Sequence, residues 1–422
     1  MKKFLSLVLA LAMMLSIASI ALAEPTTITV WATDGAETVV YTQMFEDFNA
    51  KNTDIQVDFQ PFPQDELLNK LSTADVVGDT PEVIIIDGLQ IPYYQDLDMI
   101  ACIDDYVTEE MKADVLPSVW AENTYDGKIY GVAQFDSGMG MWTRKSVMEQ
   151  LGVRIPTSST EAWTIEEFED ILAKAKDAGY AYPLYIRQNK ATSLYFTWMP
   201  IIASYGGDFL NRDTMTATGA LDSEGTIAAY DWMKKMIDAG YINAACDYED
   251  AFFGRQEALF SMLGHWKYSD HVDAFGDDAI IVPMPDYGGG VYTCSGSTVV
   301  VMTQKAVDSG LGDQAWAVID AIMSPEYIRM VCEVNGGVPA RSSVMDQMEQ
   351  WQVGGRLYLY REQLEAGISY LRPITPAHAT VYNAVANVVT DILAGQGEPA
   401  DLLHAAAEEV DEIIYENGWN IE

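Results

Sequence analysis

The sequence has few of the side chains that bind transition metals. Only four histidines and four cysteines occur among its 422 residues. His265 and His271 are the nearest pair of histidines, and their spacing is poor for a shared helix face. The cysteines lie far apart with no CxxC pair, at Cys102, Cys246, Cys294 and Cys332. We therefore predict no metal site and no other cofactor. The thiols are either free or paired in disulfides, and the sequence selects neither state.

Motifs of common catalytic sites are also missing. The sequence has no GxSxG, no HExxH, no phosphate-binding GxxxxGKS or GxxxxGKT, and no GxGxxG after a strand. Pairs of carboxylates are frequent simply because 63 residues are acidic, so they do not specify a glycosidase. We predict that the protein is not an enzyme and has no catalytic residues.

Basic residues are scarce. The chain has 24 Lys and Arg against 63 Asp and Glu, which gives a formal net charge of -39. Without Lys2 and Lys3 the balance is 22 against 63, or -41. A field of this sign repels phosphate backbones, so nucleic acid is excluded as an expected partner. The acidic residues are best interpreted as a solvated surface.

Long apolar runs are absent except at the beginning of the chain. The segment MKKFLSLVLALAMMLSIASIALAEP has a basic start, an apolar run and the small-residue ending Ala21-Leu22-Ala23. This pattern predicts a signal peptide at residues 1–23, and the alternative is an uncleaved membrane anchor. Residue 24 is Glu and not Cys, so the usual lipid-anchor site is missing. We expect an exported protein, periplasmic or extracellular.

The remaining chain alternates between strand and helix patterns. TTITVWATDG and DIQVDFQPF read as strands, and PEVIIID reads as a strand buried on both faces. Helices are predicted in TIEEFEDILAKAKDAG, where Thr164 and Glu167 fit a capping box, in SEGTIAAYDWMKKMIDAG, and in SPEYIRMVCEVNGG, where Ser324 is the expected cap. The last hundred residues read as largely helical. This alternation predicts an α/β fold.

Aromatic residues occur at several predicted element ends. The most prominent positions are Trp31, Tyr93, Tyr94, Trp142, Trp266 and Tyr268. A single aromatic residue at such a place more often packs in a core than binds a ligand. Together, flat apolar faces beside polar side chains suit the C–H face of a sugar ring.

In the order of its motifs the chain resembles the extracellular solute-binding proteins of bacterial ABC importers, in particular the maltose-binding-like sugar group. The resemblance runs through ITVWATDG, FEDFNAKNTDIQVDF, LSTADVVGDTPEVIIID, KIYGVAQFDSGMGMWTRKSVMEQLGV, WTIEEFEDILAKAKDAG, GTIAAYDWMKKMIDAGYIN, EALFSMLGHWKYSD and GGVPARSSV. It implies a type II periplasmic-binding-protein fold with two α/β lobes, an interlobe cleft and three crossings. Lobe 1 would hold residues 24–133 and 281–306, and lobe 2 would hold residues 134–280 and 307–422.

The resemblance also implies a set of ligand-binding residues. Tyr195 and Trp266 match stacking positions, and Asp136 matches a carboxylate that binds sugar hydroxyls. The other candidates are Asp34, Asp87, Gln90, Trp198, Tyr268, Arg341 and Tyr382. Core packing is an alternative for Trp198, and a structural role is an alternative for Arg341. The loop ATDGAE lacks the acidic-basic pair of maltose binders, and the tryptophan expected after PEVIIID is absent. These departures leave the identity of the sugar open.

The predicted function is therefore the binding component of a carbohydrate importer. Its expected partners are a sugar or oligosaccharide and the membrane subunits of an ABC permease, with the binding protein itself a monomer. Three alternatives remain: the same fold with another solute such as a polyamine, a secreted enzyme acting on glycans, and a surface adhesin. An anionic solute is not expected, because no basic cluster stands out in the cleft segments.

Overall fold

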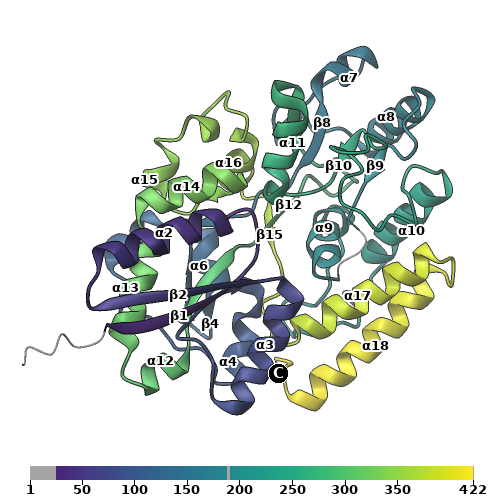
Figure 1. Cartoon of the computed structure of the whole chain (residues 1–422). Helices are drawn as coiled ribbons and strands as arrows, with labels where there is room; N and C mark the ends of the chain where they lie inside the picture. Colours follow the sequence, from purple (N-terminus) through teal and green to yellow (C-terminus); the bar gives the residue numbers. More distant parts are fainter. Residues whose placement is uncertain (1–24, 188–190, 422) are drawn as a thin grey trace, which may run out of the picture.

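A computed structural model of the chain describes residues 25–187 and 191–421 (Figure 1). The signal peptide expected at residues 1–23 lies outside this described part. The architecture is α/β with two main sheets, in agreement with the predicted fold class. In the described ranges, no helix has the length and apolar character needed to cross a membrane.

The first sheet has five strands in the order β2-β1-β3-β13-β6. Their bounds are Ile55–Phe62 (β2), Thr26–Thr33 (β1), Val83–Asp87 (β3), Thr298–Met302 (β13) and Gly131–Ala133 (β6). Strand β1 is parallel to β2 and β3, whereas β13 is antiparallel to β3 and β6. Residues Val83 to Ile86 are fully buried, as expected for an apolar strand covered on both faces.

Helices that follow or pack on these strands complete the first lobe. They are α2 (Thr38–Lys51), α3 (Gln64–Val77), α4 (Ile91–Asp96), α5 (Glu109–Asp114), α6 (Pro117–Asn123), α12 (Gln304–Asp308) and α13 (Gly312–Ile322). Two short strands, β4 (Thr124–Tyr125) and β5 (Lys128–Ile129), form a hairpin after α6. The turn η1 (Gly88–Gln90) leads from β3 into α4.

The second sheet has four strands in the order β11-β8-β10-β9. Their bounds are Ala279–Val282 (β11), Met141–Arg144 (β8), Phe260–Ser261 (β10) and Leu184–Tyr185 (β9). The helices and turns around it are α7 (Lys145–Gln150), η2 (Ser159–Glu161), α8 (Ile165–Asp177), α9 (Ala191–Ser204), α10 (Glu224–Asp238), η3 (His265–Lys267), α11 (Tyr268–Phe275) and η4 (Gly276–Asp278). Aromatic residues fill much of this core, with Trp163 and Phe168 both packed on Phe260.

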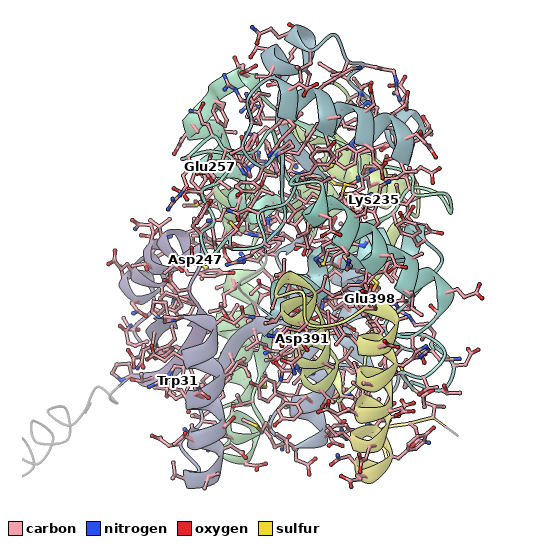
Figure 2. The ribbon with its side chains drawn as sticks, turned by 90° about the vertical axis from the view of Figure 1, so that its right-hand side faces the viewer. Trp31, Lys235, Asp247, Glu257, Asp391 and Glu398 are labelled. Atoms are coloured by element: carbon pink, nitrogen blue, oxygen red, sulfur yellow. The ribbon has the colours of Figure 1, made fainter. Side chains whose placement is uncertain are left out.

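The two C-terminal helices, α17 (His378–Leu393) and α18 (Pro399–Asn417), form a pair that packs against α9 and α10 of the second lobe. Figure 2 shows this pair in yellow, with Asp391 near the end of α17 and Glu398 just before α18. Apolar residues of α17 and α18 join one core cluster with residues of α9 and α10. This packing confirms the largely helical C-terminus.

The chain passes between the two sheets three times. The first passage runs from β6 through β7 (Phe135–Asp136) into β8, and the second runs from β11 through β12 (Thr293–Ser295) into β13. The third begins after α13 and includes α14 (Pro325–Asn335), β14 (Val338–Pro339), α15 (Ser342–Met345), η5 (Glu349–Trp351), α16 (Tyr358–Glu365) and β15 (Ser369–Leu371). Strand β14 pairs with β7, and β15 pairs with β12. The three crossing segments are therefore hydrogen-bonded to one another.

The strand pairing corrects two of the expected lobe boundaries. Ile281 and Val282 were assigned to lobe 1, but they pair with Trp142 and Met141 of β8 in the second sheet. Helix α13 was assigned to lobe 2, but it packs on β13 and β1 of the first sheet. The division into lobes otherwise remains a prediction. An apolar segment buries its face equally well in either sheet, so its pattern does not indicate which sheet it joins.

Most of the predicted helix ends are present. Thr164 and Glu167 form the expected capping box of α8, and Gly179 follows that helix with φ 104°. Ser223 caps α10 by accepting from the Thr226 backbone N–H. Ser324 occupies the N-cap position of α14, but its side chain makes no cap hydrogen bond, so this part of the prediction was wrong.

Ile85→Ala should destabilise the protein by about 2–5 kcal/mol, because the substitution leaves a cavity at the centre of the first sheet. Ile85 is 0% exposed and lies between β1 and β13. Urea unfolding followed by circular dichroism would measure the change. Val76→Ala is the matched control, since Val76 is 83% exposed on α3. Equal effects of the two substitutions would contradict this account of the core.

Candidate functional site

A cavity of 480 Å³ lies between the two lobes. One wall comes from the first lobe, in the loop after β1 and the beginning of α3. The opposite wall comes from the second lobe, and the crossing segments lie between them. The lining residues are Thr33, Asp34, Gly35, Ala36, Glu37, Pro63, Gln64, Asp87, Phe135, Ser137, Arg187, Phe196, Glu249, His265, Trp266, Lys267, Gly296, Ser297, Thr298 and Arg372. The cavity is thus built by segments from the whole length of the chain.

The first-lobe wall presents oxygen atoms. The loop is held at the end of β1 because Asp34 accepts from the Thr38 hydroxyl at 2.8 Å, and that hydroxyl accepts from the Gly35 N–H. Glu37, next in the loop, is mostly buried, and burial raises the pKa of its carboxyl. Asp34 and Glu37 therefore bring two carboxyl groups to the same wall.

The second-lobe wall carries two aromatic rings. Phe196 of α9 and Trp266 of η3 meet edge to face, with ring centroids 5.7 Å apart. Gly264 allows this position of Trp266, because a Cβ atom at residue 264 would lie 2.2 Å from the indole ring. Next to Trp266, His265 contacts the Ser137 hydroxyl and the Asn335 carbonyl, each at 3.0 Å. These contacts fix the turn that presents Trp266 to the cavity.

Three cations among the described residues line the cavity, and each is paired with carboxylates. Arg187 forms an ion pair with Glu249. Lys267 lies 3.2 Å from Glu249 and 2.9 Å from Asp270. Burial opposes ionisation of Glu249, but the two cations outweigh it and hold its pKa below the usual range. No basic cluster stood out in the sequence of the cleft segments, because these cations come from segments far apart in the chain.

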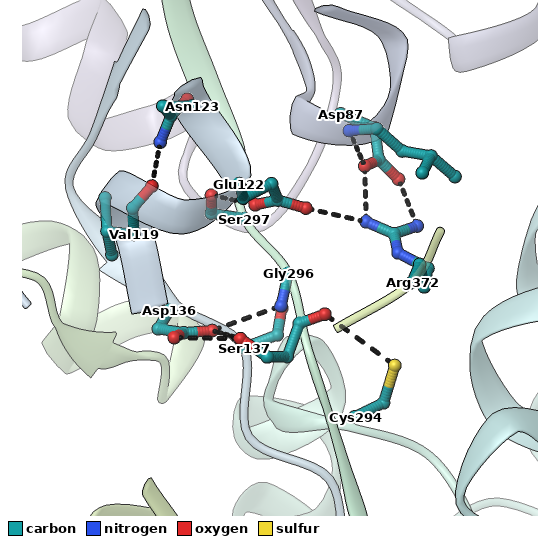
Figure 3. Close-up of polar contacts among 12 residues, drawn as sticks. Asp87, Val119, Glu122, Asn123, Asp136, Ser137, Cys294, Gly296, Ser297 and Arg372 are labelled. Atoms are coloured by element: carbon teal, nitrogen blue, oxygen red, sulfur yellow. Dashed lines mark hydrogen bonds and ion pairs between the residues drawn. The ribbon is translucent and has the colours of Figure 1, made fainter. Parts of the chain in front are cut away.

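The third cation, Arg372, lines the cavity and is 3% exposed. Its guanidinium donates to both carboxylate oxygens of Asp87, at 2.6 and 3.0 Å, and to Glu122 at 3.1 Å (Figure 3). Glu122 also accepts from the Ser297 hydroxyl at 2.5 Å. Arg372 follows β15, whereas Asp87, Glu122 and Ser297 come from the first lobe. This cluster therefore connects the third crossing to the first sheet.

The two carboxylates bound by Arg372 differ in their protonation. Burial would raise the pKa of Asp87, but the ion pair with Arg372 outweighs burial and lowers it. For Glu122, burial outweighs the attraction of Arg372 and raises the pKa to about 7. Arg372 thus stabilises the ionised form of Asp87. Glu122, the second carboxyl group, titrates near neutral pH.

Another buried carboxyl joins the first two crossings. Asp136 of β7 accepts from the Ser295 hydroxyl and from the Gly296 N–H, each at 3.1 Å (Figure 3). Asp136 is 1% exposed, and burial raises its pKa. All four cysteines are free, with Cys102 exposed and the other three buried. Among the residues with described positions, no group of three His, Cys, Asp or Glu is placed to hold a metal ion.

Three of the predicted ligand-binding residues line the cavity: Asp34, Asp87 and Trp266. Three others, Gln90, Tyr195 and Tyr382, line a smaller chamber next to it. The ligand-binding role of all six remains a prediction.

The other predicted site residues lie outside both spaces. Trp198 is in the core, stacked on Tyr230 with ring centroids 5.9 Å apart. Tyr268 packs near Trp142, at 6.1 Å between centroids. Arg341 donates to Asp114 at 2.6 Å, and Asp136 supports the crossings as described. Trp198 and Arg341 thus have the structural roles that were their alternatives.

The neighbouring rings of Tyr195 and Phe196 lie in different surroundings. Tyr195 is 0% exposed and stacks on Phe209 at 4.4 Å, whereas Phe196 lines the cavity. One residue turns a helix by about 100°, so neighbouring aromatic residues face different surroundings. The run Tyr195-Phe196 signalled an aromatic wall, but no local pattern distinguished the two rings. Arg187, Glu249, Lys267 and Arg372 had no local signal, because their partners are distant in sequence.

Comparison with known sequences identifies relatives along most of the chain. The family described as bacterial extracellular solute-binding protein matches residues 43–354. A Brucella abortus protein with a general binding-protein name is 24% identical, covering 87% of this chain and 88% of the relative. The maltotriose-binding protein of Pyrococcus abyssi is 22% identical, covering 85% and 75%. The diacetylchitobiose binding protein DasA of Streptomyces coelicolor is 23% identical, covering 89% and 87%.

Solved structures share the fold. An ABC transporter solute binding protein from Thermotoga lettingae, bound with α-D-tagatose, superposes with a TM-score of 0.79 at 20% identity, covering 92% of this chain and 100% of that chain. The maltose/maltodextrin-binding domain of Bdellovibrio bacteriovorus, bound to maltotriose, gives 0.77 at 18% identity, with the same coverage of both chains. These matches show that the two-lobed fold is that of periplasmic binding proteins.

The buried Glu122 predicts a pH-dependent stability. Its folded pKa is raised, so its contribution to stability is present below its unfolded pKa of 4.5 and is lost as the pH rises through about 7. Glu122→Gln has no carboxyl group at this position and so does not lose this stability. The free energy of unfolding of the variant minus that of the wild type should therefore rise by about 1–3 kcal/mol between about pH 5 and about pH 8.

Urea unfolding at several pH values would measure this difference. Subtracting the wild type cancels the titration of other groups, including the buried histidines His265 and His378, whose pKa values burial lowers to about 4. Glu408→Gln, at an exposed position of α18, serves as the control. A constant difference between Glu122→Gln and wild type across the pH range would contradict the assignment.

Proposed function

The chain belongs to the bacterial extracellular solute-binding proteins, and on this basis we propose that it is the binding component of a carbohydrate ABC importer. The observation that carries the proposal is the aromatic wall of Phe196 and Trp266, which faces polar side chains across a cavity between two lobes. Apolar ring faces pack on the C–H face of a sugar, and the opposite wall binds its hydroxyl groups. Relatives named for maltotriose and diacetylchitobiose support the same ligand class.

The polar groups of the cavity fit a neutral, hydroxyl-rich ligand. Asp34, Glu37 and Glu249 offer carboxyl oxygens that accept hydrogen bonds from hydroxyl groups, and bonds to charged acceptors are stronger than neutral ones. The Lys267 ammonium group supplies a donor. An anionic ligand would have to compete with the carboxylates already paired with the three cavity cations. The arrangement therefore favours a sugar without a charged group.

Binding and delivery follow from the position of the cavity. A ligand that touches both walls favours the arrangement in which the lobes are together, by as much as its affinity differs between the closed and open forms. The closed form would then be recognised by the membrane subunits of a permease. The family consists of binding proteins, and we propose that this member likewise is exported, acts as a monomer and catalyses no reaction.

A second candidate ligand is a polyamine. Burial is the main cause of the raised pKa of Glu37. The charge of the nearby Asp34 raises it further. A cationic amine between them would relieve this repulsion. Aromatic faces also attract ammonium groups, so the same walls suit either ligand class.

The ligand class can be decided by thermal unfolding of the mature chain with a panel of ligands. The panel would hold monosaccharides, maltotriose and other oligosaccharides, polyamines and amino acids. A sugar at 100 times its dissociation constant should stabilise the protein by about 2.7 kcal/mol and raise the Tm. A shift with polyamines alone would overturn the carbohydrate assignment while leaving a solute-binding role, and no shift with any sugar would count against it.

Phe196→Ala and Trp266→Ala should each raise the Kd of the sugar found in that panel by about tenfold to a hundredfold, because each removes a buried aromatic contact. Calorimetric titration would measure the Kd. Trp316→Ala is the control, since Trp316 lies on α13 and stacks on Tyr106 outside the cavity. Trp198→Ala should mainly lower stability. Unchanged affinity in both cavity variants would contradict the stacking role.

A further inference from the structure

A small chamber lies behind the ion pair of Arg372 and Asp87. Its volume is about 10 Å³, and Gln64, Asp87 and Arg372 line both this chamber and the main cavity. The far side is formed by Tyr195 of α9 and by His378 of α17. The ion pair and Gln64 thus separate the two spaces. A chamber of this volume accommodates about one oxygen atom with its hydrogens.

Three residues that line the chamber each have one buried polar atom without a hydrogen-bond partner among the described residues. These atoms are Tyr195 Oη, Arg372 Nε and His378 Nδ1. The residues are 0%, 3% and 3% exposed, so bulk water does not satisfy these atoms. Buried polar groups in proteins are nearly always hydrogen-bonded, and three such atoms beside one chamber indicate a common partner.

The chemistry of the three atoms restricts the partner. Arg372 Nε–H is only a donor, whereas a tyrosine hydroxyl both donates and accepts. Burial lowers the pKa of His378 to about 4, so its ring is neutral near neutral pH and Nδ1 takes either role. The partner must accept from Arg372. A cation cannot do so, and an anion would lie beside the carboxylate of Asp87. A neutral hydroxyl-type oxygen satisfies all three atoms.

We propose that this chamber is a binding site for one neutral hydroxyl-type oxygen, supplied either by a water molecule or by a hydroxyl group of the ligand that reaches past Arg372. The site goes beyond the proposed function and does not depend on it, since water alone can occupy it. Its place behind the cavity floor gives it a role in holding Arg372, Tyr195 and His378 in position.

A crystal structure of the mature chain without added sugar, at about 1.5 Å resolution, tests the site. We expect density for one oxygen atom within about 3.2 Å of at least two of the three polar atoms. The proposal is overturned if the ion pair is intact and the chamber holds no density. It is also overturned if the three atoms find other protein partners or face bulk solvent.

A second crystal structure, with the sugar that raises the Tm, distinguishes the two sources. A water that persists beside the sugar assigns the site to water, and a sugar hydroxyl in its place assigns it to the ligand. If no sugar in the panel binds, the proposed function fails, but the structure without sugar still decides on the chamber. The failures of the two proposals are therefore distinguishable.

Tyr195→Phe removes one of the three polar atoms and keeps the ring stacked on Phe209. The oxygen density should weaken or move in a crystal structure of this variant, and a ligand hydroxyl at the site would also raise the sugar Kd severalfold. Tyr230→Phe is the matched control. Tyr230 is 0% exposed and its hydroxyl also has no partner among the described residues, but it lies outside the chamber. Density unchanged in the Tyr195 variant would contradict its part in the site.

Discussion

The arrangement of the lobes depends on one buried guanidinium. Arg372 comes from the third crossing and binds Asp87 and Glu122 of the first lobe. Removing one partner of a buried ion pair typically costs about 3–5 kcal/mol, because the remaining charge stays buried without compensation. The carboxylates therefore hold Arg372 in a single position and tie the end of β15 to the first lobe. The crossing segments are thus connected by charge as well as by strand pairing.

The same residue shapes the binding cavity. The Arg372 guanidinium lies over the Phe196 ring, 5.0 Å from its centroid, and Phe196 contacts Trp266. A cation over an aromatic face is attracted by the electrons of the ring, so the ion-pair cluster also orients the aromatic wall. The floor and one wall of the cavity are therefore a single connected unit. Movement of the third crossing would be transmitted to the rings that line the cavity.

Local features of this protein could be predicted from sequence, and long-range ones could not. The buried strand PEVIIID and the capping box at Thr164 are encoded within a few residues, so pattern and propensity were sufficient. The pair of Arg372 and Asp87 joins residues 285 positions apart, and no local pattern indicates it. No local pattern indicated which of Tyr195 and Phe196 lines the main cavity, because this depends on the rotation of α9 against its neighbours.

The distribution of the thiols has a practical consequence. Cys102 is exposed in the first lobe, whereas Cys246, Cys294 and Cys332 are buried. A maleimide dye would therefore attach to the native protein at one position. With a second cysteine introduced on the surface of the other lobe, a donor and an acceptor fluorophore would report the separation of the lobes in single molecules.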